Sequence, residues 1–560
     1  MPNDIMTGSR DTTGSRRDSE ALTNANGISA DETIEYESMQ GILGIEDVQS
    51  YNKGGNHPVH LDDVLEGRFE VVHKLGHGGF GIVWLCRDIL LGKWRAVKVM
   101  AAEHSSRGNE ERIYSYLRNR CTLKELEENH LTIPSEQFWI EGPNGRHLCL
   151  VMPVLGWTVS DWRMSKRDFL EQTDIEAKEA CRQIAKALHF LHSHGIGHGD
   201  FRPENILMQI EGVDDLDKDQ ILDLLGEPEC VDVTIESGRS SVPRAPEYCV
   251  QRADEYWCRN MSTASITIVD FGESFFAATP PRTTGIPNQY APPEIMFNET
   301  GVPGLYSDIW SLACTLFEVR TSSVLFEPPL GGVSNMPVDS IEVYLGPLPK
   351  LYSMAYVEMF RDIQRAIRTP APAGEETKPE PRKPLTSPER KAPRETKAER
   401  IERSRHRLTD GSGYSDVFEA RLGEEQKVLR ELQGPEYASL YPNSEFITWQ
   451  YTRKEVLELA DLLRKMLRYD PAERIDIDEV ISHPWIGAEI RYASIRKLLG
   501  YRVFMRDFGI ILPTLVVAFM AIPVLWISAP RVVGLFLEES SSKLSQLVTK
   551  GWRVLLQNIL

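Results

Sequence analysis

Apolar residues along this chain form short runs in the first part and helically spaced patterns farther on. Runs rich in β-branched and aromatic residues predict strands, whereas apolar residues recurring with the α-helical period predict helices. Strands are expected over residues 69–75, 82–85 and 94–100 and, with a connector, 147–156; helices are expected over 110–117, 174–194 and 306–318. A chain of 560 residues with this pattern predicts two structural lobes plus tails and insertions.

The turn between the first two predicted strands is rich in glycine and reads Gly76-His-Gly-Gly-Phe-Gly81. Glycine lets the backbone close over phosphates and direct its N–H groups toward them. A glycine-rich hairpin without a ligand has the same pattern, so the turn alone does not decide. The strand over 94–100 carries Lys98, which either points to solvent from an edge strand or reaches nucleotide phosphates. Glu110 fits the role of its helical partner best, with Glu111 one residue away.

A short polar run between apolar segments, Ile196–Leu207, places Asp200 five residues before Asn205. An aspartate can accept the proton of an attacking hydroxyl, while an asparagine carbonyl can hold a metal ion on nucleotide phosphates. Asp270 ends a later strand and is followed by Phe-Gly. Since Mg²⁺ prefers carboxylate and carbonyl oxygens, Asp270 and Asn205 are candidate Mg²⁺ ligands.

Three further features follow Asp270 in the sequence. Tyr290-Ala-Pro-Pro-Glu294 precedes the long apolar helix over 306–318, and Asp308 near its start is a candidate anchor. Arg474 lies far along the chain. An ion pair between Arg474 and Glu294 would join the loop before the long helix to the far end of the domain.

The order of these motifs resembles that of a eukaryotic protein kinase over roughly residues 51–486. The closer resemblance is to SR-protein kinases, carried by 51–60, 142–149, 154–156 and 344–349 and by a long insertion before Asp270. It implies an α+β, two-lobed fold with a small β-rich N-lobe over about 69–155 and a larger helical C-lobe over about 156–486. It also implies a Ser/Thr protein kinase that uses ATP and Mg²⁺ on protein substrates such as Arg/Ser-rich splicing factors.

The resemblance also assigns site residues. Asp200, Arg202 and Asn205 would be catalytic, and Asn205 and Asp270 would bind Mg²⁺. Val83, Ala96 and Leu207 would sandwich adenine, Met152 would guard the back of the pocket, and His198 and Phe271 would pack inside. The full ATP-binding set would be Leu75, Gly76, His77, Gly78, Gly79, Phe80, Gly81, Ile82, Val83, Ala96, Lys98, Glu110, Met152, Val154, Leu155 and Leu207.

Three residues depart from the family pattern. Gly199 stands where many kinases carry Arg, which implies activity without phosphorylation of the activation loop. Arg202 replaces the usual Lys, and Arg and Lys are not interchangeable. Asn288 replaces the Arg of the SR-protein kinase branch. A catalytically weak kinase fold used as a scaffold is the alternative. A small-molecule phosphotransferase of the aminoglycoside-kinase type is disfavoured by Glu294, the long helix and Arg474.

The remaining segments lie outside the kinase-like pattern. Residues 1–40 and the basic, Pro-rich stretch 368–408 are expected to be disordered, because both lack an apolar period. The acidic stretch 209–265 reads as a loop-rich insertion with a helix at 216–225. Residues 508–529 carry no charge and are long enough to span a bilayer; the alternative is a helix hairpin packed on the C-lobe.

Composition and charge narrow the setting. The chain has 41% hydrophobic and 26% charged residues, as soluble globular proteins do. Its net charge of −19 argues against direct nucleic-acid binding, which needs clustered Lys and Arg. The N-terminus shows no signal-peptide core. We therefore expect the catalytic part in the cytoplasm, the nucleus or both, with a candidate C-terminal membrane anchor.

Overall fold

The computed structural model describes residues 35–39, 44–105, 109–165, 170–235, 244–258, 260–297, 302–329, 336–368, 396–424, 426–429 and 446–487. These residues belong to a unit that spans Met1–Gly487. The candidate membrane segment 508–529 lies outside them. Within the described ranges, every helix is too short or too polar to cross a bilayer.

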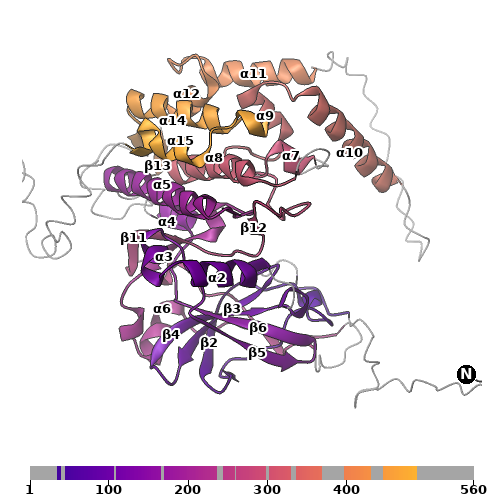
Figure 1. The fold of residues 1–560 in the computed structure, drawn as a ribbon, viewed down its shortest axis with the longest axis vertical. Coiled ribbons are helices and arrows are strands. Elements are labelled where there is room, and N and C mark those ends of the chain that lie inside the picture. The colour runs from indigo at the N-terminus through magenta and orange to yellow at the C-terminus, as the bar shows by residue number, and fades with distance from the viewer. Residues whose placement is uncertain are drawn as a thin grey trace, which may run out of the picture. The chain divides into compact units, whose positions relative to one another are not determined.

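The N-terminal part of the chain forms an antiparallel sheet in the order β1-β2-β3-β4-β6-β5 (Figure 1). Its strands are β1 Val64–Leu65, β2 Phe69–Gly78, β3 Gly81–Asp88, β4 Lys93–Met100, β5 Glu136–Gly142 and β6 Gly145–Met152. The last five residues of β4, up to Met100, are all buried, and Arg95 before them is half-buried. Lys98 is therefore a buried cation on a central strand, opposite Val83 and Leu150, which excludes the solvent-facing alternative.

Helices dominate the rest of the described chain. They are α1 Ala102–Ser105, α2 Asn109–Arg120, α3 Leu123–Glu128, α4 Val159–Ser165, α5 Leu170–Ser193, α6 Lys218–Leu225, α7 Pro293–Met296, α8 Leu305–Thr321, α9 Val338–Leu345, α10 Lys350–Arg368, α11 Lys397–Thr409, α12 Val417–Leu422, α14 Arg453–Met466, α15 Ile477–Ser482 and α16 Pro484–Gly487. α8 is buried on all sides from Ser307 to Thr321, as expected for an apolar helix at the centre of a core. It packs against α5, and α2 lies between the sheet and α5 (Figure 1).

Two short antiparallel ribbons hold the polar motifs together. β7 Ile196–Gly197 pairs with β12 Phe275–Phe276, and β8 Ile206–Ile210 pairs with β11 Ser262–Ile268. Residues 198–205 form the connection between β7 and β8, while Asp270-Phe-Gly lies between β11 and β12. Backbone pairing thus brings two motifs about 70 residues apart to one place, since Ile206 is directly opposite Ile268.

The insertion 209–265 is more ordered than its composition suggests. The predicted helix at 216–225 corresponds to α6, and β9 Cys230–Asp232 pairs with β10 Tyr248–Val250. Apolar residues spread along it are buried against the sheet; they include Val213, Ile221, Leu225, Val233, Ile235, Cys249 and Val250. The described parts of the insertion thus contain more regular structure than a loop-rich segment, and their apolar residues pack on the sheet.

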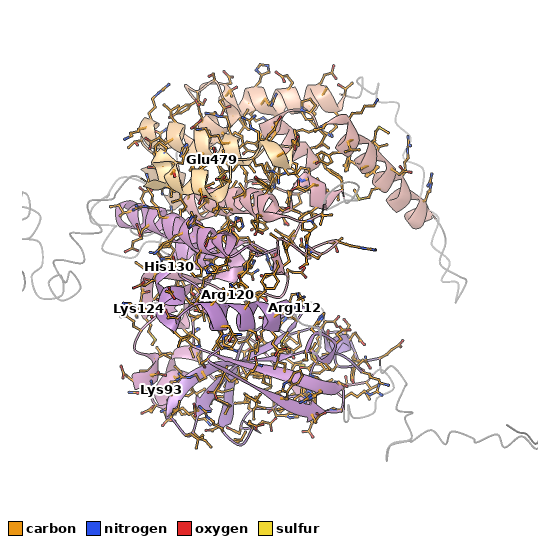
Figure 2. All side chains as sticks on the ribbon, in the orientation of Figure 1. Lys93, Arg112, Arg120, Lys124, His130 and Glu479 are labelled. Carbon is orange, nitrogen blue, oxygen red and sulfur yellow. The ribbon has the colours of Figure 1, made fainter. Side chains whose placement is uncertain are left out.

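Polar contacts fasten the same insertion to the sheet. Trp94 of β4 donates its backbone N–H to Asp214 Oδ1 at 2.8 Å and its indole N–H to the Leu216 carbonyl at 2.9 Å. Lys93, at the start of β4, lies 3.8 Å from the Asp214 carboxylate (Figure 2). A side of β4 that would otherwise face solvent is thereby covered.

Two segments expected to be disordered, 1–40 and 368–408, contain ordered residues. Tyr36 is buried and its hydroxyl donates to the Tyr51 carbonyl at 3.2 Å. At the end of the basic stretch 368–408, α11 begins after Thr396, whose side chain forms a capping box with Glu399. Arg400 of α11 reaches Asp339 of α9 at 2.6 Å. These parts differ from the prediction because caps and ion pairs order segments that lack apolar periodicity.

Candidate active site

Lys98 is the meeting point of three elements. Its ammonium lies 3.1 and 3.2 Å from the two Glu110 carboxylate oxygens and 3.1 Å from Asp270 Oδ1. Glu110 comes from α2 and also accepts the Tyr114 hydroxyl at 2.9 Å. Glu111, the alternative partner, is instead hydrogen-bonded to Gln137. The structure therefore joins the sheet, α2 and the segment after β11 through one buried cation.

The surroundings of Lys98 and Asp270 determine the charge that each carries at neutral pH. Burial alone would lower the pKa of Lys98, but the carboxylates of Asp270 and Glu110 outweigh it and raise that pKa above its usual value. For Asp270, burial acts to raise the pKa, yet the Lys98 ammonium outweighs it and lowers the pKa below its usual value. Lys98 is thus a cation and Asp270 an anion at neutral pH, as phosphate binding and metal coordination both require.

The segment between β7 and β8 arranges Asp200, Arg202 and Asn205. Asn205 donates its side-chain N–H to the Asp200 backbone carbonyl and to Asp200 Oδ2, both at 2.8 Å. Arg202 Nε lies 3.0 and 3.1 Å from the two oxygens of Asp200. Its Nη1 lies 3.1 Å from Glu204. The carboxylate of Asp200 is thereby oriented by two neighbours, and the Arg202 charge is directed at Asp200.

The carboxylate of Asp308 binds the backbone of this segment. Its Oδ2 accepts the His198 N–H at 2.7 Å and its Oδ1 accepts the Gly199 N–H at 3.0 Å. Since Asp308 is in the first turn of α8, the segment is anchored to a helix that is buried on all sides. The ring of Phe271 lies 5.4 Å from His198 and 5.5 Å from Tyr114. A stack of side chains therefore runs from residues 198–205 to α2.

The glycine-rich turn joins β2 to β3 above Lys98. A Cβ on Gly76, Gly78 or Gly79 would meet nothing within 4 Å, so the space around their backbones is open. A Cβ on Gly81 would lie 2.3 Å from the Val99 carbonyl oxygen, so this glycine is needed for close strand approach. Phe80 points back toward Lys98, whose ammonium is 5.9 Å from its ring centre.

The other residues predicted to bind the nucleotide divide into two groups. Ala96 is opposite Met152 in the sheet, and Leu207 forms a bridge with Thr158. The side chains of Ile82 and Val154 are instead buried in separate apolar clusters, Ile82 with Val71 and Val154 with Val72. Side chains alternate along a strand, so Ile82 and its neighbour Val83 face opposite sides. Ile82 and Val154 could therefore contact a ligand only through the backbone. Leu75 and His77 lie at the start of the glycine-rich turn.

Sequence reasoning missed two contributors to the site. Tyr114 is one helical turn after Glu110, and this spacing was the available signal for its hydrogen bond. Glu273 follows Asp270-Phe-Gly; burial is the main cause that raises its pKa, and the negative charges of Asp200 and Asp270 add to it. No local signal in the sequence indicates that Glu273 shares the field of these two carboxylates.

Glu294 and Arg474 form a buried, bidentate ion pair at the far end of the helical region. Arg474 Nη1 lies 2.6 Å from Glu294 Oε1, and Nη2 lies 2.7 Å from Oε2. Arg474 also donates to the backbone carbonyls of Arg468 and Tyr306 at 2.9 Å. The pair joins α7, the start of α8 and the segment before α15.

Gly199 has a left-handed backbone, with φ of +79°, and a Cβ there would lie 2.3 Å from the Glu273 carbonyl oxygen. An arginine would not fit this conformation. We expect Gly199→Ala to lower the free energy of unfolding by more than about 1–3 kcal/mol and to lower activity, because the strand end and Glu273 must both move. Gly212→Ala is the control: φ is +82° and nothing lies within 4 Å. Equal losses in urea unfolding for both variants would contradict the role given to Glu273.

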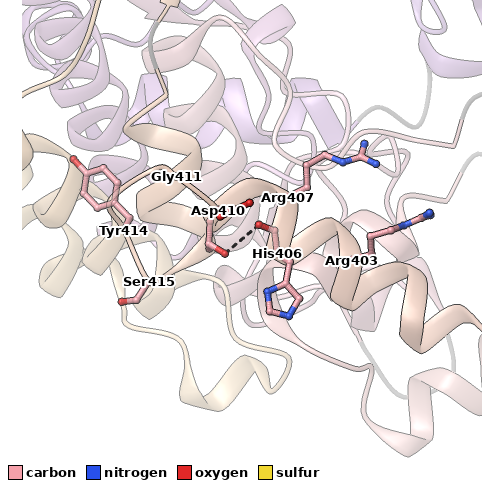
Figure 3. A pocket seen from close by; sticks show the side chains of 8 residues that line it. Arg403, His406, Arg407, Asp410, Gly411, Tyr414 and Ser415 are labelled. Carbon is pink, nitrogen blue, oxygen red and sulfur yellow. Dashed lines mark hydrogen bonds between the residues drawn. The ribbon is translucent and has the colours of Figure 1, made fainter.

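A surface hollow of about 740 Å³ lies elsewhere, where α11 ends (Figure 3). There the Asp410 N–H donates to the His406 carbonyl at 2.8 Å. The lining residues are Arg403, His406, Arg407, Thr409, Asp410, Gly411, Tyr414 and Ser415. None of the candidate site residues lines it, so this hollow is separate from the group around Lys98.

Comparison with known proteins identifies the fold around this group. Residues 69–223 match the family model described as protein kinase domain. These residues belong to a protein kinase domain. Human SRSF protein kinase 3 is 36% identical over 179 residues, which cover 30% of this chain and 31% of that protein. The match thus spans less than a third of the relative's length.

Other relatives extend the comparison over more of the chain. Serine/threonine-protein kinase SRPK of Physarum polycephalum is 24% identical over 454 residues, 79% of this chain and 91% of that protein. A crystal structure of a kinase domain aligns with a TM-score of 0.42 at 19% identity over 77% of this chain and 98% of that chain. The kinase domain, with its β-rich sheet and helical region, is therefore similar to SR-protein kinases at moderate identity.

Proposed function

We propose that this chain is an active Ser/Thr protein kinase that transfers the γ-phosphate of ATP to protein substrates. The observation that carries the proposal is the joint arrangement of two groups. In the first group, Glu110 and Asp270 are both bound to the Lys98 ammonium. In the second, Asn205 Nδ2 lies 2.8 Å from Asp200 Oδ2. A catalytic phosphoryl-transfer site needs both groups.

The residues present fit ATP and Mg²⁺. Asp270 accepts from Lys98 and Gly272 through Oδ1, which leaves Oδ2 as a metal ligand. Asn205 donates through its N–H₂ group, which leaves its carbonyl oxygen as a second ligand. Mg²⁺ takes such oxygens together with phosphate oxygens and would neutralise the charge that develops on the transferred group. Lys98 would hold nucleotide phosphates, and the backbone of residues 76–81 would close over them.

Each protein group then has one task in the transfer. Asp200 orients the substrate hydroxyl and accepts its proton, because Asn205 and Arg202 hold its carboxylate in place. Asp308 keeps the backbone of the catalytic segment fixed. Gly199 offers no guanidinium for a phosphorylated activation loop, which supports activity that does not depend on such a modification.

The charge around Asp200 supports basic protein substrates. Glu204, whose side chain is 46% exposed, pairs with Arg202 beside Asp200, and Glu273 lies near Asp200 and Asp270. Several carboxylates of one sign at the mouth of a site attract cations and raise the local concentration of basic peptides. We therefore propose Arg/Ser-rich proteins, such as splicing factors, as the substrate class. The basic hollow at α11 and the segment 508–529 have no assigned part in this proposal.

A pair of peptides tests the substrate class. We expect a peptide of repeated Arg-Ser to be phosphorylated about tenfold faster, at low substrate concentration, than one in which Gln replaces Arg, because charge attraction raises the association rate. The ratio should fall in high salt and in Glu204→Gln. Equal rates for both peptides at low salt would contradict the basic-substrate proposal while leaving the kinase proposal intact.

The second candidate function is a catalytically weak kinase fold that serves as a scaffold. Two observations favour it: Arg202 engages both oxygens of Asp200, and Phe80 points toward Lys98. The first contact offsets part of the negative charge of Asp200, and the second places an aromatic ring near the lysine that would hold phosphates. Under this alternative the chain would bind substrate proteins without transferring phosphate to them at a measurable rate.

A further inference from the structure

Lys74 of β2 is fully buried, two residues before the glycine-rich turn. Lysine is rarely buried without a partner. Its partner is Glu46, which precedes the sheet in sequence and is 5% exposed. The Lys74 ammonium also donates to the Val250 carbonyl at 2.9 Å. Glu46 in turn accepts the hydroxyl of buried Tyr51. Lys74 directly precedes Leu75, the first residue of the candidate ATP-binding set, and none of these four residues belongs to that set.

The backbone repeats this connection. The Ala253 N–H donates to the Lys74 carbonyl at 2.9 Å, and Lys74 forms a parallel bridge with Arg252. The Arg252 N–H donates to the Gly44 carbonyl at 3.0 Å. Two segments distant in sequence, 44–51 and 249–253, therefore hold β2 at one residue. We name these two segments the loop clamp.

The contact falls at one of the two register shifts in the pairing of β2 with β3. The pairing of β2 with β3 shifts between Lys74 and Gly76, so the ladder to β3 is interrupted just before the turn that would cover the phosphates. The segments of the loop clamp supply hydrogen bonds to β2 at this point. The position of Gly76–Gly81 is thus set by contacts with 44–51 and 249–253 as well as by the hairpin itself.

An apolar cluster makes the loop clamp a continuous structure. Val48 and Tyr51 from one segment and Cys249 and Val250 from the other are buried together. They pack with residues of the sheet, namely Val71, Ile82, Trp84, Val97 and Val99. Withdrawal of residues 44–51 would expose this cluster and leave Lys74 as a buried charge without its carboxylate, which is strongly unfavourable.

We propose that Glu46, Tyr51 and Lys74 are positioning residues, and that the loop clamp fixes the glycine-rich turn for nucleotide binding. The proposal rests on the proposed function in that ATP is the nucleotide. The clamp couples the N-terminal segment and the insertion to the affinity for ATP, while the residues that carry out proton transfer lie elsewhere.

The test uses the full-length chain and the variants Glu46→Gln and Tyr51→Phe, with ATP kinetics and amide hydrogen exchange of residues 76–81. For Glu46→Gln we expect the KM for ATP to rise about tenfold, as a small displacement of binding groups can produce, with kcat changed by less than about twofold. Exchange at 76–81 should be faster without nucleotide. Tyr51→Phe keeps the ring and should show the same effects more weakly, which covers the case in which Glu46→Gln fails to fold.

Lys218→Met is the matched control, because Lys218 also joins the insertion to β2, through an ion pair of 2.7 Å to Glu70 near the other end of the strand. Lys218 is 41% exposed and also pairs with Asp62, before β1, at 3.0 Å. The variant should leave both readouts unchanged. Folded Glu46→Gln or Tyr51→Phe protein with wild-type KM and wild-type exchange would overturn the proposal. If the wild-type chain transfers no phosphate, the proposed function fails, while exchange at 76–81 still decides on the loop clamp.

Discussion

Asp200→Ala is expected to lower kcat for peptide phosphorylation by about 10²–10⁴-fold, the usual contribution of a positioned general base. The variant also removes the acceptor that orients Asn205 and Arg202. ATP binding should change far less, because Lys98, Glu110 and the turn at 76–81 do not depend on Asp200. Steady-state kinetics with a basic seryl peptide, together with titration of MgATP, give both quantities.

Asp478→Asn provides the control for this variant. Asp478 is 79% exposed on α15 and pairs only with His189 among the described residues. Its replacement should leave kcat and the affinity for ATP unchanged. A fall in kcat of similar size in both variants would mean that the loss in Asp200→Ala reflects a general defect of the protein.

Glu294→Ala is expected to cost about 3–5 kcal/mol of the free energy of unfolding, because it leaves the Arg474 charge buried without its partner. The Arg474 side chain is 0% exposed, and its remaining acceptors are two backbone carbonyls. The guanidinium also lies 5.2 Å from the ring centre of Trp310, so the disturbance reaches α8. Urea-induced unfolding followed by circular dichroism measures the change.

Asp339→Ala breaks an ion pair of the same type on the surface. Asp339 and Arg400 are 45% and 52% exposed and 2.6 Å apart. Exposed pairs contribute about 0–1 kcal/mol, so this variant should remain close to wild type. Comparable losses in the two variants would contradict the view that burial gives the Glu294–Arg474 pair its weight.

Sequence patterns predicted those parts of the molecule in which local spacing determines structure. β2, β3, β4, β6, α2, α5 and α8 follow from apolar periods that match a strand or a helix. The choice of Glu110 over Glu111 followed from the side of α2 that carries Ile113, Tyr114 and Leu117, all of which are buried. The order of the motifs supplied the kinase resemblance, and a protein kinase domain is shown for residues 69–223.

Long-range contacts were not predictable in the same way. Lys74 and Glu46 are far apart in sequence and lie in segments without a shared period, so nothing local indicates that they pair. The apolar residues of the insertion are separated by acidic and polar stretches, which hides the surface that they cover. Nothing in the sequence indicates which neighbour Arg202 contacts, and in the structure its Nε lies 3.0 Å from Asp200 Oδ1. The fit of Gly199 beside Glu273 depends on a backbone angle that composition does not report.

Phosphoserine formation measures most directly whether this kinase domain transfers phosphate. The full-length chain is incubated with MgATP and an Arg/Ser-rich protein, and the phosphoserine formed per molecule of kinase is counted by mass spectrometry. We expect many turnovers for the wild type and almost none for Asp200→Ala. Wild-type protein that binds MgATP but forms no more phosphoserine than Asp200→Ala would contradict the kinase proposal and favour the scaffold.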